Sequence, residues 1–123
     1  MSMSILLALS LASAPAPREV APGVTLLPGA ILPERGPDGN TVIFDAPEGL
    51  VVVDTGRHAW HSDAILAYAK SRGRPITAIV NTHWHLDHTS GNGRVRAAHP
   101  DAPVHATGAV DRVRAEGGLL ARN

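Results

Sequence analysis

Four stretches of the chain carry apolar and β-branched residues at nearly every position, a pattern that predicts β-strands. They cover residues 24–27, 41–44, 50–53 and 76–80. The first stretch follows a segment rich in proline and glycine, so we expect an edge strand there. Pro37-Asp38-Gly39-Asn40 predicts a turn, because proline fixes φ and glycine or asparagine accepts a positive φ. Pro47-Glu48-Gly49 predicts the short loop of a β-hairpin.

Helical spacing of apolar residues appears between residues 60 and 70. Gly73 and Pro75 follow it, and both residue types commonly end helices. Later in the chain we expect a helix, a short strand and an amphipathic segment, over residues 91–98, 104–106 and 109–116. The succession of hairpin, helix and strand predicts an α/β fold with a mixed sheet.

The runs 50–53 and 76–80 do not alternate between apolar and polar residues. Strands of this kind usually lie in a sheet that is covered on both faces. The predicted helices can cover one face, and no predicted element covers the other. An exposed apolar face of this size favours pairing, so we expect self-association through it.

Composition excludes several classes of function. The 123 residues are enough for one domain or part of a larger one, and a hydrophobic content of 44% supports a folded core. Eleven basic residues balance eleven acidic ones, so the chain lacks the charge of a nucleic-acid-binding protein. There is no cysteine, which excludes disulfides and thiolate metal sites.

The N-terminus carries a short apolar run over residues 5–12, followed by Ala12-Ser13-Ala14 and a Pro-Ala-Pro sequence. Eight residues are too few to span a bilayer. Residues 1–14 fit a secretory signal peptide, with Ala12 and Ala14 in the small-x-small cleavage pattern. This interpretation predicts a periplasmic or secreted protein. No Lys or Arg precedes the run, so an ordinary N-terminal segment of a cytoplasmic protein is the alternative.

The densest chemical signal is His83-Trp84-His85-Leu86-Asp87-His88, which places four metal-ligand side chains within six residues. Imidazole and carboxylate are ligands that suit zinc. In an extended loop His83 and His85 point to the same side and can share one metal ion. Asp87 and His88 are adjacent, so we expect their side chains to diverge and to address a second ion. Such sites lower the pKa of bound water to near neutral.

This motif after a buried strand resembles the metallo-β-lactamase superfamily, whose hallmark is His-x-His-x-Asp-His. Val52-Val53-Asp54-Thr55-Gly56 is similar to a second signature of that family. The resemblance covers residues 24 to 110 and implies the N-terminal ββα half of an αβ/βα sandwich. It implies that His83 and His85 bind one zinc ion, that Asp87 and His88 bind another, and that Asp54 holds the metal loop behind them.

The same resemblance implies a second ββα half that supplies three further ligands. We therefore assign residues 20–123 to a metallo-β-lactamase-like domain that is incomplete at its C-terminus, and expect two Zn²⁺ per complete domain. The implied activity is zinc-dependent hydrolysis of a small-molecule substrate. In it a metal-bound hydroxide attacks an ester, thioester, lactone or β-lactam carbonyl, and Asp87 serves as the catalytic residue that orients it.

Two alternatives stay open. One is an iron-dependent persulfide dioxygenase relative, and the other is a truncated half-domain that binds metal without catalysis. For Asp54 the alternative is a capping residue at the end of a strand. Trp84 is expected to pack within the loop, and Thr89 and Ser90 lack a base that would make either a nucleophile.

Four other histidines lie outside the motif. We expect His58 and His61, at the start of the predicted helix, to be solvated or capping residues. His99 and His105 follow the motif too closely to replace ligands of a second half. His105 lies on a predicted strand, and we expect a structural or surface histidine there.

Overall fold

The apolar runs form one sheet in the computed structural model, which describes residues 15–109 and 111–112. In spatial order, the strands of this part of the chain are β1 (Arg18–Ala21), β2 (Val24–Leu27), β5 (Thr41–Ala46), β6 (Gly49–Val53), β7 (Ile76–Val80) and β8 (Val104–His105). A separate small hairpin joins β3 (Ile31–Leu32) to β4 (Gly36–Pro37). The helices are α1 (Ala59–Arg72), α2 (Leu86–Thr89) and α3 (Asn92–Ala98).

Antiparallel pairing connects β1, β2, β5 and β6, and parallel pairing connects β6 to β7 and β7 to β8. The predicted mixed α/β architecture is therefore confirmed. The prediction that residues 24–27 form an edge strand is wrong, because β1 pairs with β2 and takes the edge position. The predicted hairpin is confirmed, with Val42 opposite Val53 and Ile43 opposite Val52.

The predicted turn at residues 37–40 is also wrong. The chain turns earlier, at residues 33–35, where the N–H of Arg35 donates to the carbonyl of Leu32 at 3.1 Å. Gly36 has a φ of 82° there, which glycine adopts without steric cost. Pro37 belongs to β4, and Asp38 after it is buried.

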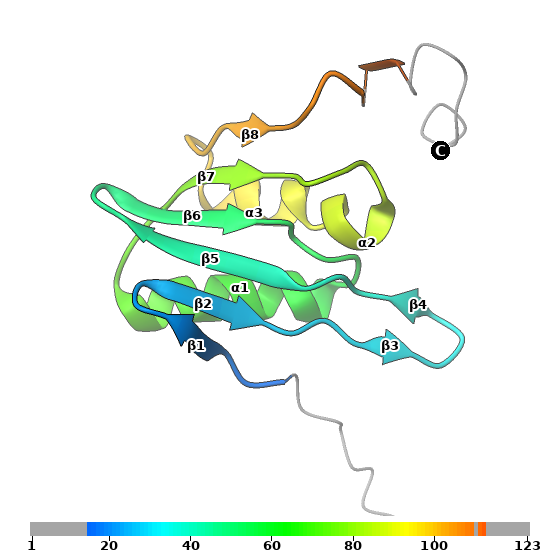
Figure 1. The fold of residues 1–123 in the computed structure, drawn as a ribbon, viewed down its shortest axis with the longest axis horizontal. Helices are drawn as coiled ribbons and strands as arrows, with labels where there is room; N and C mark the ends of the chain where they lie inside the picture. Colours follow the sequence, from blue (N-terminus) through cyan, green and yellow to red (C-terminus); the bar gives the residue numbers. More distant parts are fainter. Residues whose placement is uncertain (1–14, 110, 113–123) are drawn as a thin grey trace, which may run out of the picture.

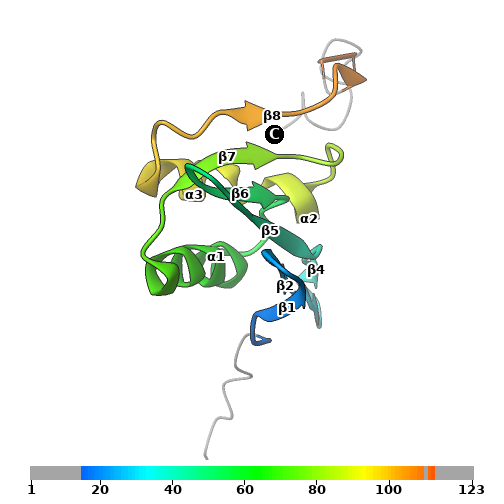
Figure 2. The same ribbon diagram turned by 60° about the vertical axis from the view of Figure 1, so that its left-hand side comes forward.

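Helices α1 and α3 lie on one side of the sheet, and α2 lies beyond the ends of β6 and β7 (Figures 1 and 2). The side chains that point to this side form the core with α1 and α3. The core residues of the described part are Leu27, Ile43, Leu50, Val52, Ile65, Ala69, Ile76, Ile79, Val95 and Ala102. Helix α1 ends at Gly73, whose left-handed φ of 62° and bonds to the carbonyls of Ala69 and Lys70 close the helix as predicted.

The opposite face of the sheet is apolar and has no helix over it in the described part of the chain (Figure 2). The pairing places its residues in two rows, of which one is Val24, Phe44, Val51 and Ala78 and the other is Leu26, Val42, Val53 and Val80. These side chains are half-buried, except Phe44, which is 42% exposed. The expected self-association through this face stays a prediction.

The prediction that His61 is a solvated or capping residue is wrong, because its side chain is fully buried under the start of β5. Its Nε2 lies 2.7 Å from the hydroxyl of Thr41, which donates to the carbonyl of Asp54 at 2.9 Å. A hydroxyl has one hydrogen, so His61 must donate to Thr41 from Nε2. His58, by contrast, is the N-cap residue of α1 and is partly exposed.

Some expectations concern residues outside the described part. The predicted signal peptide over residues 1–14 lies entirely outside the described part. Most of the predicted amphipathic segment over residues 109–116 also lies outside it, and Asp111 and Arg112, which are described, are helical. No helix of the described residues has the length and hydrophobicity needed to cross a membrane.

Neighbouring residues on β5 test which face of the sheet is the core. Ile43 is 1% exposed and Phe44 is 42% exposed. We expect Ile43→Ala to lower the free energy of unfolding by about 2–5 kcal/mol, because it leaves a cavity. Phe44→Ala should cost less than about half of that, although it removes the larger side chain. Urea unfolding at low protein concentration measures both variants, and a larger loss for Phe44→Ala would contradict the assignment of the core face.

Burial lowers the pKa of His61, and the nearby Asp38 carboxylate offsets this only in part. Below the ordinary pKa of 6.5 the unfolded chain binds a proton that the folded protein does not. The contribution of neutral His61 is therefore present above pH 6.5 and is lost as the pH falls toward the lower folded pKa, by at most about 1.4 kcal/mol per pH unit. Urea unfolding from pH 7.5 to 5.5 should be less pH-dependent for His61→Gln, and equal slopes would refute the effect.

Candidate metal site

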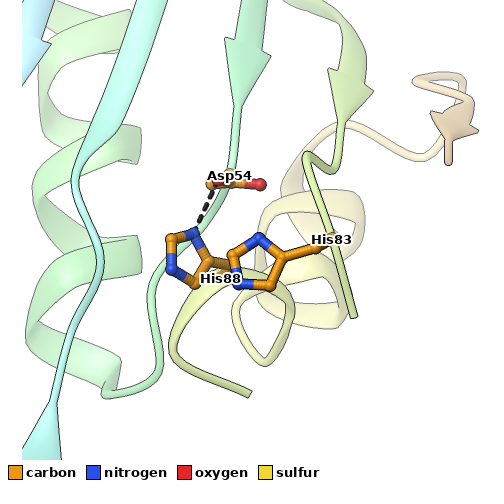
Figure 3. Close-up of side chains that lie close together, drawn as sticks. All are labelled: Asp54, His83 and His88. Atoms are coloured by element: carbon orange, nitrogen blue, oxygen red, sulfur yellow. Dashed lines mark hydrogen bonds and ion pairs between the residues drawn. The ribbon is translucent and has the colours of Figure 1, made fainter. Parts of the chain in front are cut away.

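The motif residues gather where β6 and β7 end (Figure 3). Because the two strands are parallel, their carboxyl ends meet at the same edge of the sheet. Asp54 directly follows β6, and residues 81–83 directly follow β7. The N–H of Asp54 donates to the carbonyl of Val80 at 2.9 Å, which fixes the two strand ends together.

Asp54 is buried, with 3% of the residue exposed. The hydrogen-bond partners of its carboxylate lie in the metal loop, which comprises residues 81–88. Its Oδ1 accepts the N–H of Thr82 at 2.9 Å, and its Oδ2 accepts the hydroxyl of Thr82 at 2.7 Å. Oδ2 also lies 2.7 Å from Nδ1 of His88. An ionised carboxylate can only accept, so His88 carries its proton on Nδ1 and leaves Nε2 with a free lone pair.

The same argument determines the tautomer of His83. The hydroxyl of Thr82 donates its hydrogen to Asp54, so it must accept from Nδ1 of His83, which lies 2.9 Å away. His83 therefore also presents an unprotonated Nε2. One buried carboxylate thereby determines the tautomers of two imidazoles, one directly and one through a threonine.

The donor atoms converge on one place. The ring centroids of His83 and His88 are 4.1 Å apart, and those of His83 and His85 are 4.6 Å apart. Oδ2 of Asp87 lies 3.4 Å from Nε2 of His88. The expected divergence of Asp87 and His88 is therefore wrong. Both lie in the helical turn α2, not in an extended loop, and this turn brings their donor atoms together.

Ligand atoms of Asp54, His83 and His88 all lie within 4.8 Å of one another. Asp54 nevertheless already accepts three hydrogen bonds, so it is better suited to orienting the imidazoles than to binding the ion itself. His83, Asp87 and His88 then remain as two imidazoles and a carboxylate on the solvent side. This donor set fits zinc, and imidazole also suits iron.

A second group of polar residues holds the backbone of His88. Its carbonyl accepts the N–H of Thr55 at 2.8 Å and lies 3.4 Å from the side-chain amide of Asn81. Asn92 donates to Asn81 at 2.6 Å and accepts the hydroxyl of Thr55 at 2.8 Å. The backbone of Gly91 packs against the carbonyl of Thr55 so closely that a Cβ would not fit. Asn81 and Asn92 were missed from the sequence, and no supporting role was predicted for Thr55, although it lies in the second signature.

The remaining motif residues have simpler surroundings. His85 is exposed, and the ring of Trp84 packs edge-on against it, with centroids 4.7 Å apart. Thr89 donates its hydroxyl to the carbonyl of His85 at 3.1 Å, and Ser90 is exposed. Trp84 therefore packs within the loop, as expected.

The two later histidines lie beside different ends of β7. His105 is exposed on β8, as the sequence predicts for a surface residue. Nδ1 of His99 accepts the N–H of Ile76 at 3.3 Å, which links the end of α3 to the start of β7. His99 thus lies at the end of β7 opposite the motif, whereas the carbonyl of His105 accepts the N–H of Asn81 at the end that leads into the motif.

Known proteins are similar to this chain in sequence and in fold. A family model described as the metallo-beta-lactamase superfamily matches residues 35–120. The linear primary-alkylsulfatase of Pseudomonas sp. (strain ATCC 19151) is 48% identical over 50 residues, which are 40% of this chain and 10% of that protein. Hydroxyacylglutathione hydrolase of Synechococcus sp. is 45% identical over 56 residues, which are 46% of this chain and 21% of that protein.

The solved structure of a metallo-beta-lactamase from Hirschia baltica superposes with a TM-score of 0.66 at 25% sequence identity. The match covers 82% of this chain and 47% of that one. The chain thus spans about a tenth and a fifth of the two curated relatives, and about half of the solved structure. Because the family model matches well over half of its residues, the chain belongs to the metallo-beta-lactamase superfamily.

Proposed function

We propose that the protein acts as a zinc-dependent hydrolase that cleaves an ester, thioester, lactone or β-lactam carbonyl bond. The observation that carries this proposal is the convergence of ligand atoms of Asp54, His83 and His88 at the edge of the sheet, with Oδ2 of Asp87 3.4 Å from Nε2 of His88. Sites for small molecules commonly lie at the carboxyl ends of parallel strands. The names of the relatives, an alkylsulfatase and a hydroxyacylglutathione hydrolase, support ester-type substrates.

The residues of the chain have separate tasks in this proposal. His83 and His88 offer Nε2 lone pairs, and Asp54 and Thr82 hold both rings in the required tautomer. His85 lies beside His83 and adds a third imidazole to the ligand set. A bound zinc ion supplies a Lewis acid and lowers the pKa of water toward neutral.

Asp87 is the catalytic residue of the proposal. Its carboxylate is partly exposed, at 24% of the side chain, and lies beside the Nε2 donor of His88. A carboxylate in this position can accept a hydrogen bond from the attacking water and orient it toward the carbonyl carbon. Asp87 lies in the first turn of the short helix α2, and its carbonyl accepts the N–H of Gly39 at 2.9 Å.

A non-catalytic metal-binding half-domain is the second candidate. It is favoured by the number of ligands, since two zinc ions need about three protein ligands each and the motif supplies four in all. An iron-dependent oxygenase shares the imidazole ligands, and elemental analysis of the purified protein separates iron from zinc.

Replacing His83, His85, Asp87 and His88 together by alanine tests the metal site. We expect bound zinc to be lost, because no other donors converge in the part of the chain that the structure describes. Elemental analysis measures the metal, and a chromogenic β-lactam and a thioester measure hydrolysis. The variant His99→Ala is the control, since His99 lies at the other end of β7. Unchanged zinc content and turnover in the fourfold variant would contradict the proposal. Zinc binding without turnover in the parent chain would favour the half-domain.

Asp54→Asn tests whether tautomer control supports zinc binding. An amide cannot replace the carboxylate that accepts from both Thr82 and His88, so we expect zinc affinity to fall about 10- to 100-fold. Competition with a chelator measures the affinity. Asp63→Asn is the matched control, because Asp63 is 55% exposed and pairs only with Arg94 on the surface. Equal losses in both variants would show that Asp54 has no special role.

A further inference from the structure

We propose that Asp38 is a positioning residue of the metal site. Asp38 holds Gly39 in the place where the backbone of Gly39 packs against the imidazole of His88. The proposal rests on the proposed function only in treating His88 as a metal ligand. It concerns residues far outside both sequence motifs, 49 and 50 positions before His88, and a segment that the sequence pattern had assigned to a turn.

The carboxylate of Asp38 is buried, with its side chain 0% exposed. Oδ1 accepts the backbone N–H groups of Arg57 and His58, the latter at 2.8 Å, and Oδ2 pairs with Nδ1 of His58. Burial alone would raise the pKa of Asp38, but the hydrogen bonds from His58 and Arg57 outweigh it and hold the pKa below its usual value. Asp38 is therefore an ionised group bound to the residues just before α1.

The start of α1 has no other carboxylate. His58 makes no capping hydrogen bond with its side chain, and the first turn of α1 contains no acidic residue. Asp38, twenty positions earlier, supplies the negative charge that the N-terminus of a helix favours. This contact attaches the segment before β5 to a rigid helix of the core.

Gly39 transmits that attachment to the metal loop. Its N–H donates to the carbonyl of Asp87 at 2.9 Å. A Cβ at Gly39 would lie 2.6 Å from Cε1, 2.8 Å from Nε2 and 2.9 Å from Nδ1 of His88. The backbone of Gly39 is thus in direct contact with the face of the imidazole, and only a residue without a side chain fits there.

The backbone conformation does not explain why residue 39 is a glycine. The described glycines with a positive φ are Gly23, Gly36, Gly56 and Gly73, and Gly39 is not among them. Gly39 does not need the left-handed conformation that favours glycine, and the three atoms nearest to a Cβ at this position all belong to the His88 ring. With Asp54 bound to Nδ1 and Gly39 against the ring face, the direction of Nε2 is set from two sides.

The experiment compares Gly39→Ala and Asp38→Ala with Gly93→Ala and Asp63→Ala. Gly93 is the matched control, because a Cβ there has no atom within 4 Å, and Asp63 is an exposed carboxylate on α1. Long-range ¹H–¹⁵N spectra of the metal-free proteins at pH 7.5 report the His88 tautomer. Chelator competition with Zn²⁺ reports affinity, and thermal unfolding of the metal-free proteins reports stability.

We expect His88 to be protonated on Nδ1 in the parent and in both controls, and to become a tautomer mixture in Gly39→Ala and Asp38→Ala. The dissociation constant for Zn²⁺ should rise at least about tenfold in these two variants and stay unchanged in the controls. Asp38→Asn, which keeps an oxygen for the backbone N–H groups, should recover part of the loss. If Asp38 only stabilised α1, Asp38→Ala would lower the unfolding temperature but leave the His88 tautomer and the zinc affinity unchanged.

Parent-like tautomer and zinc affinity in Gly39→Ala and Asp38→Ala would overturn the proposal, whatever their unfolding temperatures. A parent chain that binds no Zn²⁺ would instead count against the proposed function. The metal-free spectra would still decide whether Asp38 and Gly39 position His88. If Gly39→Ala does not fold, the comparison of Asp38→Asn with Asp38→Ala gives the same decision.

Discussion

The carboxylate of Asp54 is the group on which the arrangement of the site depends. It joins the end of β6 to the loop after β7 through Thr82 and to α2 through His88. Without it, the loop would be tied to the sheet mainly by the bonds to the His88 carbonyl, and neither imidazole would have a fixed tautomer. The geometry of the metal donors is thus a consequence of one buried anion and its acceptor capacity.

Asp54 occupies its position at a conformational cost. Its φ of 62° is in the left-handed region, which costs a residue with a side chain on the order of 1 kcal/mol. The surroundings enforce this conformation through the backbone, because the carbonyl of Asp54 accepts the hydroxyl of Thr41, which His61 holds in turn. In the left-handed conformation the carboxylate of Asp54 points toward the loop after β7. In an extended conformation residue 54 would instead continue β6.

The sequence predicted the regular parts well. The strands β2, β5, β6 and β7, the hairpin of β5 and β6, and α1 follow from apolar runs and from Gly73, since these depend on local preferences and burial, whereas β1, β3 and β4 were not predicted. The metal-ligand candidates follow from residue type and spacing. Thr82, Asn81 and Asp38 could not be found in this way, because a threonine, asparagine or aspartate has many structural uses and only the folded chain brings its partner close. The α2 turn was missed because four residues carry no periodicity.

Most of the residues that hold the metal donors are buried, although Thr82 is exposed, and this burial has a chemical reason. Asp38, Thr55 and Asp54 are buried, whereas His88 and Asp87 are partly exposed, at 21% and 24% of their side chains. Buried anchors keep their hydrogen bonds free of competition from water, so they fix directions well. The donors themselves must stay accessible, because an ion and its substrate reach them from solvent. A site built with the opposite order would hold its ligands loosely and hide them from the ion.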